Sequence, residues 1–99
     1  MLILIGYIHL APSDVAAFSA DVRAASAITR AEEGCLFHSI SLDDPQAGRM
    51  LLVQRWLDQA CLDAHLATAA ATAFLTRWQG RLAIDVQRYT ATDGVALMH

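Results

Sequence analysis

Trp56 and His65 are the residues of this chain best suited to chemistry, and nine positions separate them. Histidine has an ordinary pKa of about 6.5, which suits proton transfer at neutral pH, and a general base typically accelerates a reaction by about 10²–10⁴-fold. The indole of Trp56 can stack on an aromatic ligand and keep water away from it. The two rings therefore predict a site where a proton is taken from an aromatic compound in an apolar pocket.

The residues around this pair predict a strand followed by a helix. In residues 50–56 the side chains alternate, so that Gln54 and Trp56 share one face of a strand. Asp58 is a good helix N-cap, and apolar residues recur after it at spacings of three and four. If this helix folds back over the strand, His65 points into the gap between them. The predicted helix face consists of Cys61, Leu62, His65 and Leu66.

The remaining histidines and a glutamine are weaker candidates. His38 is a second candidate base, and Gln54 can hold a ligand oxygen but cannot act as an acid or a base. On the residues alone, two plainer interpretations stay open: Trp56 as a large core residue, and His65 as a hydrogen-bonded core residue. The spacing of His9, His38 and His65 is not that of metal ligands, so no metal site is predicted.

The composition predicts one domain with more apolar surface than its own fold can hide. The chain has 99 residues, of which 56% are hydrophobic and 17% charged, and self-association is the simplest way to cover the excess. A net charge of −3 without a basic cluster argues against a nucleic-acid partner. Residues 1–12 lack a positively charged start and are too short for a membrane span, so we expect a strand in a cytoplasmic protein with no membrane partner. Cys35 and Cys61 form no disulfide framework of the secreted kind.

Apolar periodicity and turn residues predict the order strand, helix, strand, strand, helix, strand. Right-handed crossovers turn this βαββαβ order into an α+β, ferredoxin-like antiparallel sheet with both helices on one face. Both sides of the first strand are mostly apolar, so the uncovered face needs a partner, most simply a second copy of the same sheet. The predicted elements are a strand at 2–10, a helix from Pro12 and Ser13 to near Glu32, a strand at 35–42, a turn at 43–48, a strand at 50–56, a helix from Asp58 that restarts at Thr68 and stops at Gly80, and a strand at 81–89.

The motifs in this order resemble those of the antibiotic biosynthesis monooxygenase family, a group that includes quinol monooxygenases. The resemblance covers nearly the whole chain and implies a single domain over residues 1–99, with a core at 1–90 and a tail at 91–99 that contacts a partner subunit. It rests on Glu33-Gly34-Cys35 entering a strand, Trp56 closing a strand, Asp58 as a cap, Ala64-His65-Leu66 after it, and Phe74 beyond.

The resemblance also implies a dimeric α+β barrel, a homodimer in which two sheets face each other and each subunit holds its own pocket. Family members oxidise quinols or polyketide-like aromatics with O2 and without metal, flavin or haem, so we expect no cofactor. Because such an oxidation requires a base to remove a proton from the substrate, we expect His65 to be the general base, with His38 second and with Trp56 stacked on the substrate as a further catalytic residue. The residues expected to bind the substrate are Gln54, Gly6, Leu66 and Phe74.

Four positions depart from the family pattern. Gln54 stands where many relatives have Glu, Ala70 where a second His often follows, and His38 where Tyr is common. Gly6 matches an Asn of the haem-degrading branch, and the chain contains no Asn, which argues against haem degradation. Two other functions therefore stay open: an isomerase that uses His65 to shuttle a proton on a small carbonyl compound, and a dimeric ligand-binding or stress-related protein without catalysis.

Overall fold

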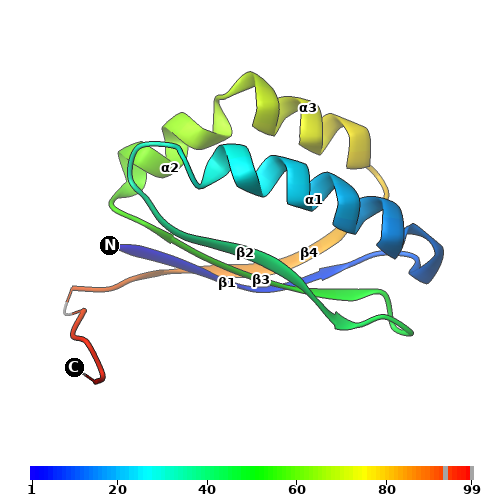
Figure 1. The fold of residues 1–99 in the computed structure, drawn as a ribbon, viewed down its shortest axis with the longest axis horizontal. Coiled ribbons are helices and arrows are strands. Elements are labelled where there is room, and N and C mark those ends of the chain that lie inside the picture. Colours follow the sequence, from blue (N-terminus) through cyan, green and yellow to red (C-terminus); the bar gives the residue numbers. More distant parts are fainter. Residues whose placement is uncertain (93, 99) are drawn as a thin grey trace.

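A four-stranded antiparallel sheet carries three α-helices on one of its faces in the computed structural model, which describes residues 1–92 and 94–98 (Figure 1). The strands lie in the order β2-β3-β1-β4, as right-handed crossovers require of a βαββαβ chain. The predicted α+β, ferredoxin-like fold is therefore confirmed. The elements are β1 (Leu2–His9), a short 3₁₀ helix η1 (Pro12–Asp14), α1 (Val15–Thr29), β2 (Cys35–Asp44), β3 (Arg49–Trp56), α2 (Gln59–Leu66), α3 (Ala69–Trp78) and β4 (Ala83–Thr90).

Alternation along the strands separates the two faces of the sheet. On β1, Leu2 and Ile8 are buried under the helices, whereas Ile5 and Tyr7 are 43% and 39% exposed on the opposite face. β1 lies inside the sheet, because it pairs with both β3 and β4. The main core under the helices consists of Ile8, Leu10, Phe18, Val22, Met50, Leu52 and Trp78. A second, smaller cluster consists of Leu2, Trp56 and Leu62.

Helix α1 is shorter than the sequence pattern predicts. The 3₁₀ turn η1 precedes it, and neither η1 nor α1 has a side-chain cap, so Ser13 does not cap the helix as expected. α1 ends at Thr29 rather than near Glu32, because the N–H groups of Ala31 and Glu32 bond to carbonyls only three residues earlier. These tight turns bring Glu32 next to α2.

Gly34 allows the chain after these turns to pass close to α2. Its φ is 77°, a conformation that glycine adopts without steric cost. A Cβ at this position would lie 2.3 Å from the Cys61 sulfur, so no side chain fits there. The loop that leads into β2 and the first turn of α2 are therefore in direct contact.

Two capping residues divide the second helical segment, as predicted. The Asp58 carboxylate accepts a hydrogen bond from the Cys61 N–H (2.9 Å), and the Thr68 hydroxyl accepts one from the Ala71 N–H (3.1 Å). The Thr68 hydroxyl also donates to the His65 carbonyl at 2.7 Å. The chain therefore bends between α2 and α3, and His65 lies in the last turn of α2.

The hairpin between β2 and β3 is tighter than predicted, because β2 extends to Asp44. Asp43 and Asp44 belong to the strand and not to the turn. The Asp44 carboxylate accepts hydrogen bonds from the N–H groups of Gln46 and Ala47, which closes the turn, and Asp43 pairs with Arg49 at 2.6 Å.

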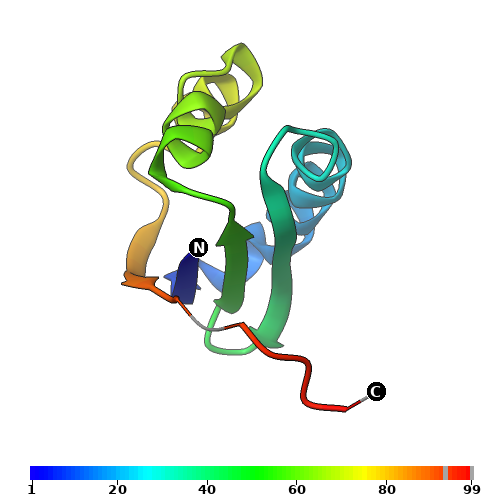
Figure 2. The same ribbon diagram turned by 90° about the vertical axis from the view of Figure 1, so that its left-hand side faces the viewer.

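The helices cover the sheet in two groups. α1 lies above β2, whereas α2 and α3 lie toward the side of the sheet that ends in β4 (Figure 2). None of the helices described in residues 1–92 and 94–98 has the length and apolarity that a membrane crossing needs.

The C-terminal tail extends past the sheet on the side away from the helices (Figures 1 and 2). Val95 and Leu97 in it are 83% and 96% exposed. Asp93 and His99, which belong to the tail predicted to contact a partner subunit, lie outside the described residues.

Candidate active site

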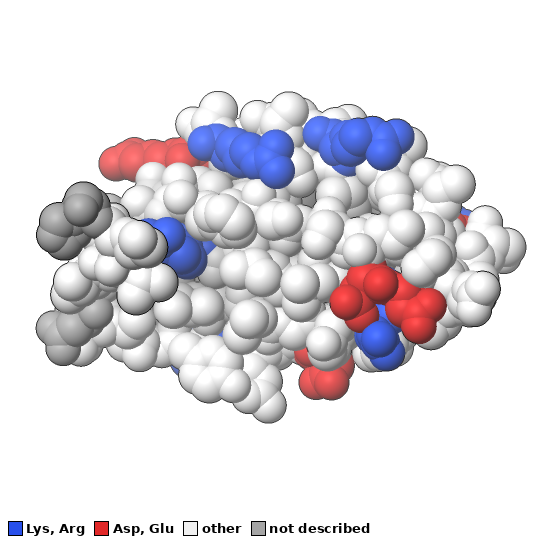
Figure 3. Space-filling view, turned by 60° about the horizontal axis from the view of Figure 1, so that its bottom comes forward, with Lys and Arg blue, Asp and Glu red and all other residues white. Residues whose placement is uncertain are grey.

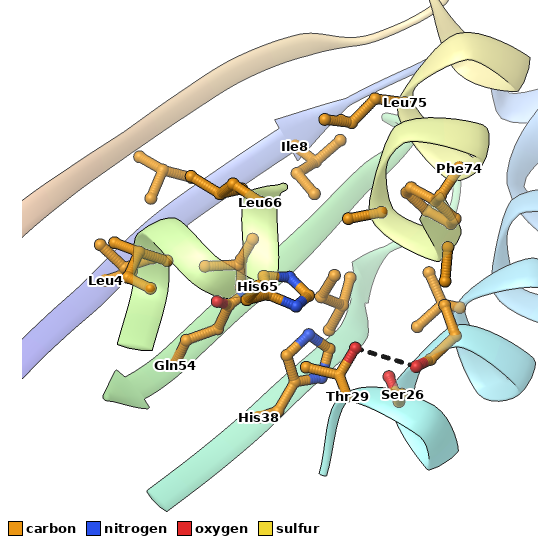
Figure 4. Close-up of a pocket in the computed structure, with 18 of the residues that line it drawn as sticks. Leu4, Ile8, Ser26, Thr29, His38, Gln54, His65, Leu66, Phe74 and Leu75 are labelled. Carbon is orange, nitrogen blue, oxygen red and sulfur yellow. Dashed lines mark hydrogen bonds between the residues drawn. The ribbon is translucent and has the colours of Figure 1, made fainter. Parts of the chain in front are cut away.

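A cavity of about 360 Å³ lies between the helix-covered face of the sheet and the helices. Most of its lining residues are apolar, and a few polar side chains reach it from α1, β2, β3 and α2 and from the turn after α1. Such a chamber is the usual form of a small-molecule site. Several of the predicted site residues line it, namely His38, Gln54, His65, Leu66 and Phe74 (Figure 4).

His65 is paired with a carboxylate at this cavity. Its Nδ1 lies 2.5 Å from Oε2 of Glu32, and the two side chains are only 13% and 20% exposed. An ionised carboxylate only accepts hydrogen bonds, so the His65 Nδ1 carries the proton, and Nε2 is the nitrogen left to take one. The pair has the geometry of a general base held by a carboxylate.

Trp56 holds the His65 ring in place. Its indole is fully buried and stacks on the imidazole, with ring centroids 4.9 Å apart and an interplanar angle of 30°. Trp56 is not among the residues that line the cavity. The indole therefore positions His65, which differs from the expected stacking on a ligand.

Gln54 connects this stack to the cavity. Its Oε1 accepts a hydrogen bond from the Trp56 indole N–H at 3.0 Å, and its side chain is 7% exposed and lines the cavity. Because the oxygen is already bound, the amide N–H groups of Gln54 are the part that remains to donate to a ligand oxygen.

His38 is a histidine of a different kind. It is 7% exposed, and its Nδ1 has no hydrogen-bond partner among the described residues. Burial, with the nearby charges of His65 and Arg30, lowers its pKa from 6.5 to about 4. Arg30 fixes this part of β2 by donating from Nε and Nη2 to the His38 carbonyl, at 3.2 and 3.1 Å. His38 is thus neutral at neutral pH, a weak base that can hydrogen-bond to a ligand.

Gly6 does not line the cavity. It lies opposite Leu52 on β3 and Val86 on β4, and a Cβ there would come within 2.1 Å of the Asp85 carbonyl oxygen. The close approach of β4 therefore requires a glycine, and the position offers no side chain to a ligand.

Glu32 completes the site, although no local spacing in the sequence points to it. It precedes His65 by 33 positions and lies in a turn outside any helix or strand. A physical argument could have indicated that His65 has a polar partner, because a histidine on an apolar helix face needs a hydrogen-bond partner when it is buried. Ser26 and Thr29, on the cavity side of α1, were not predicted either.

The arrangement suits acid–base chemistry. His65 can take a proton, and Gln54 and His38 can hydrogen-bond to a ligand oxygen beside it. Within residues 1–92 and 94–98, no group of three or more His, Cys, Asp or Glu side chains is placed to hold a metal ion.

Comparisons with known proteins agree on one family. Residues 1–77 match the antibiotic biosynthesis monooxygenase family. The crystal structure of a proposed antibiotic biosynthesis monooxygenase from Deinococcus radiodurans superimposes with a TM-score of 0.85 at 23% identity, over 100% of both chains. A Pseudomonas aeruginosa protein gives a TM-score of 0.80 at 27% identity, over 93% of this chain and 94% of its own.

A further crystal structure, of an antibiotic biosynthesis monooxygenase, gives a TM-score of 0.77 at 25% identity, over 97% of this chain and 100% of its own. No curated protein sequence matches the chain. Because the family match spans most of the 99 residues, the chain belongs to the antibiotic biosynthesis monooxygenase family.

Proposed function

We propose that this protein is a cofactor-independent monooxygenase that oxidises a quinol or polyketide-like aromatic with O2, with His65 as the general base. The observation that carries the proposal is the Glu32–His65 pair at an apolar cavity. Family membership supports the monooxygenase assignment, as do the names of two structural relatives.

The first step is removal of a proton from a hydroxyl group of the substrate. A phenolate gives an electron to O2 far more readily than a phenol, so the base controls the reaction. His65 Nε2 takes the proton, and the imidazolium that forms keeps its Nδ1–H on the Glu32 carboxylate, which stabilises the new charge. The apolar walls strengthen this interaction, because charges are screened less in such surroundings.

The electrons that O2 gains all come from the substrate. Electron transfer from the phenolate gives superoxide and a semiquinone, and their combination forms a carbon–oxygen bond to a peroxide, which takes the proton back from His65. Loss of water then breaks the O–O bond and leaves a hydroxyquinone. One oxygen atom of O2 enters the product and the other leaves as water. Gln54 and His38 stabilise the substrate oxygen by hydrogen bonds during these steps.

Oxygen uptake with a panel of hydroquinones tests the proposal. We expect O2 consumption, incorporation of one labelled oxygen atom from isotopic O2, and unchanged turnover after dialysis against a chelator. His65→Ala should lose most of this O2 uptake. Its matched control is Asp63→Ala on the exposed side of α2, which should keep its activity. An isomerised product without O2 uptake would overturn the proposal in favour of an isomerase. Binding without turnover of any panel member would favour a ligand-binding protein.

We also propose that the uncovered face of the sheet joins two copies of the chain into a homodimer. Ile5, Tyr7 and Phe37 are 43%, 39% and 46% exposed, and the register of β1, β2 and β3 places them together on this face. Figure 3 shows the face as a broad uncharged area with charged side chains toward its margins. An apolar face of this kind favours association with a second apolar surface.

Light scattering tests the homodimer independently of activity. We expect twice the mass of the chain at micromolar concentration. Tyr7→Glu should shift the protein toward the monomer, whereas Ile28→Glu, on an exposed position of α1, should not. A monomer for the unaltered protein would exclude this interface.

A further inference from the structure

The cavity is polar at one end and apolar at the other. It extends across the whole sheet, since its lining residues come from β2 at one edge and β4 at the other. Figure 4 shows the labelled polar side chains on one side of the cavity, with Ile8, Leu66, Phe74 and Leu75 on another. The polar lining residues are Ser26, Thr29, Glu32, His38, Gln54 and His65, and all of them lie on α1, the turn after it, β2, β3 or α2.

The apolar end is also where the cavity opens to solvent. Leu66, Leu75 and Ile84 line the cavity and are nevertheless 50%, 47% and 58% exposed. Side chains that are both lining and half exposed must lie at the mouth. The mouth is therefore bounded by the end of α2, by α3 and by the edge strand β4.

No permanently charged cation among the described residues lines this cavity. No Arg side chain of the described residues lines it, and the chain contains no Lys. The one carboxylate in the lining, Glu32, is paired with His65. An anionic group that enters the cavity with the ligand would lose its hydration without meeting an arginine or lysine, and the Glu32 carboxylate beside His65 would repel it, which is unfavourable. The chemistry of the lining selects a neutral ligand with its hydroxyl at one end.

We propose that the mouth is a binding subsite for an alkyl chain, and that Leu66, Leu75 and Ile84 select neutral phenols or hydroquinones by the length of that chain. The hydroxyl lies at His65, and the substituent lies between Leu66, Leu75 and Ile84. The hydroxyl end of this assignment rests on the proposed function. The subsite itself follows from the position of apolar side chains at an open end of the same cavity.

Calorimetric binding of 4-alkylphenols under anaerobic conditions tests the subsite without any reaction. We expect Kd to fall by about twofold to fourfold for each added methylene, because a fully buried methylene gives close to the upper value. A 4-alkylbenzoate of equal chain length should bind at least about tenfold more weakly, since its carboxylate meets no arginine or lysine and lies near the Glu32 carboxylate.

Ile84→Thr keeps a β-branched side chain in β4 and removes its apolar end, so it should flatten the dependence on chain length. Ile28→Thr is the matched control, because Ile28 is 56% exposed on α1 and does not line the cavity. Leu75→Gln provides a second variant at the mouth, should Ile84→Thr fail to fold.

The outcomes separate this proposal from the proposed function. A chain-length dependence without O2 uptake would support the subsite and reject the oxidation. O2 uptake whose KM does not depend on chain length, or equal binding of the benzoate, would overturn the subsite alone. The same chain-length dependence in folded Ile84→Thr and Leu75→Gln would also overturn it.

Discussion

The polar end of the cavity and its mouth differ in how firmly their side chains are held. At the polar end, His65 is fixed by Glu32 and by the stacked Trp56, and Trp56 is itself bonded to Gln54. At the mouth, the apolar side chains are half exposed and have no directional contacts to fix them. One chamber thus combines a rigid half with an adaptable half.

This difference separates two requirements of the proposed chemistry. Proton transfer requires defined geometry, because a base must lie within hydrogen-bond reach of the proton that it removes. Burial of an apolar substituent requires area and not direction. Changes at the polar end should therefore affect kcat, and changes at the mouth should affect binding.

His65→Ala should produce the largest effect, because it removes the base from the rigid half. We expect kcat for hydroquinone oxidation to fall by about 10²-fold or more, as general base catalysis is lost. The Kd of an alkylphenol should change by less than about tenfold, since most of its buried area is unaffected. Oxygen-electrode assays and calorimetry measure the two quantities. Unchanged turnover in a folded variant would remove His65 from the mechanism.

Glu32→Gln should have the next largest effect, because it replaces a charged hydrogen bond to the base by a neutral one. We expect kcat to fall by about tenfold. Nitrogen NMR of the imidazole should show a larger fraction of the tautomer protonated on Nε2 than in the unaltered protein. Glu33→Gln is the matched control, since Glu33 is exposed and adjacent. If Glu32→Gln keeps both the rate and the position of the proton, Glu32 does not position His65.

His38 should make the free energy of unfolding depend on pH. Its pKa is about 4 in the folded protein and 6.5 ordinarily, so below pH 6.5 the unfolded chain binds a proton that the folded protein does not. The stabilisation from neutral His38 is therefore present above pH 6.5 and is lost as the pH falls toward 4. Urea denaturation should show a smaller loss of unfolding free energy over this range in His38→Gln. An equal loss in both proteins would contradict the burial of His38 as a neutral group.

Ala71→Leu should have the smallest effect, since it adds volume to the adaptable half only. Ala71 lines the cavity from α3. We expect KM for the longest alkylated hydroquinone to rise by about threefold, through crowding, with kcat unchanged. Ala73→Leu, at an exposed position of the same helix, should change neither constant. A drop in kcat for Ala71→Leu would show that the two halves are coupled.

Local patterns were sufficient to predict the fold. Alternation fixed the strands, and the capping residues Asp58 and Thr68 correctly divided the second helical segment. The end of α1 was misplaced, because two residues beyond Thr29 form tight turns that the apolar pattern does not distinguish from helix. The chain then passes close to Cys61 at Gly34, an approach between separate elements that no short window of sequence contains.

The site was only partly accessible from the sequence. His65 and Gln54 could be placed on facing elements from their periodicity, and the structure brings both to the cavity. The place of Trp56 under the imidazole and the pairing with Glu32 both arise from contacts between separate elements. Periodicity shows which face a residue occupies but not which neighbour it meets there.

The missing side chain at Gly34 has a consequence for the distance between base and carboxylate. Glu32 lies two residues before Gly34, and Cys61 lies one helical turn before His65. The close approach of residue 34 to the Cys61 side chain therefore sets the spacing of the two segments whose side chains meet in the Glu32–His65 hydrogen bond. A methyl group added there would wedge the segments apart, and an inactive variant would arise from a position that touches neither the ligand nor the proton.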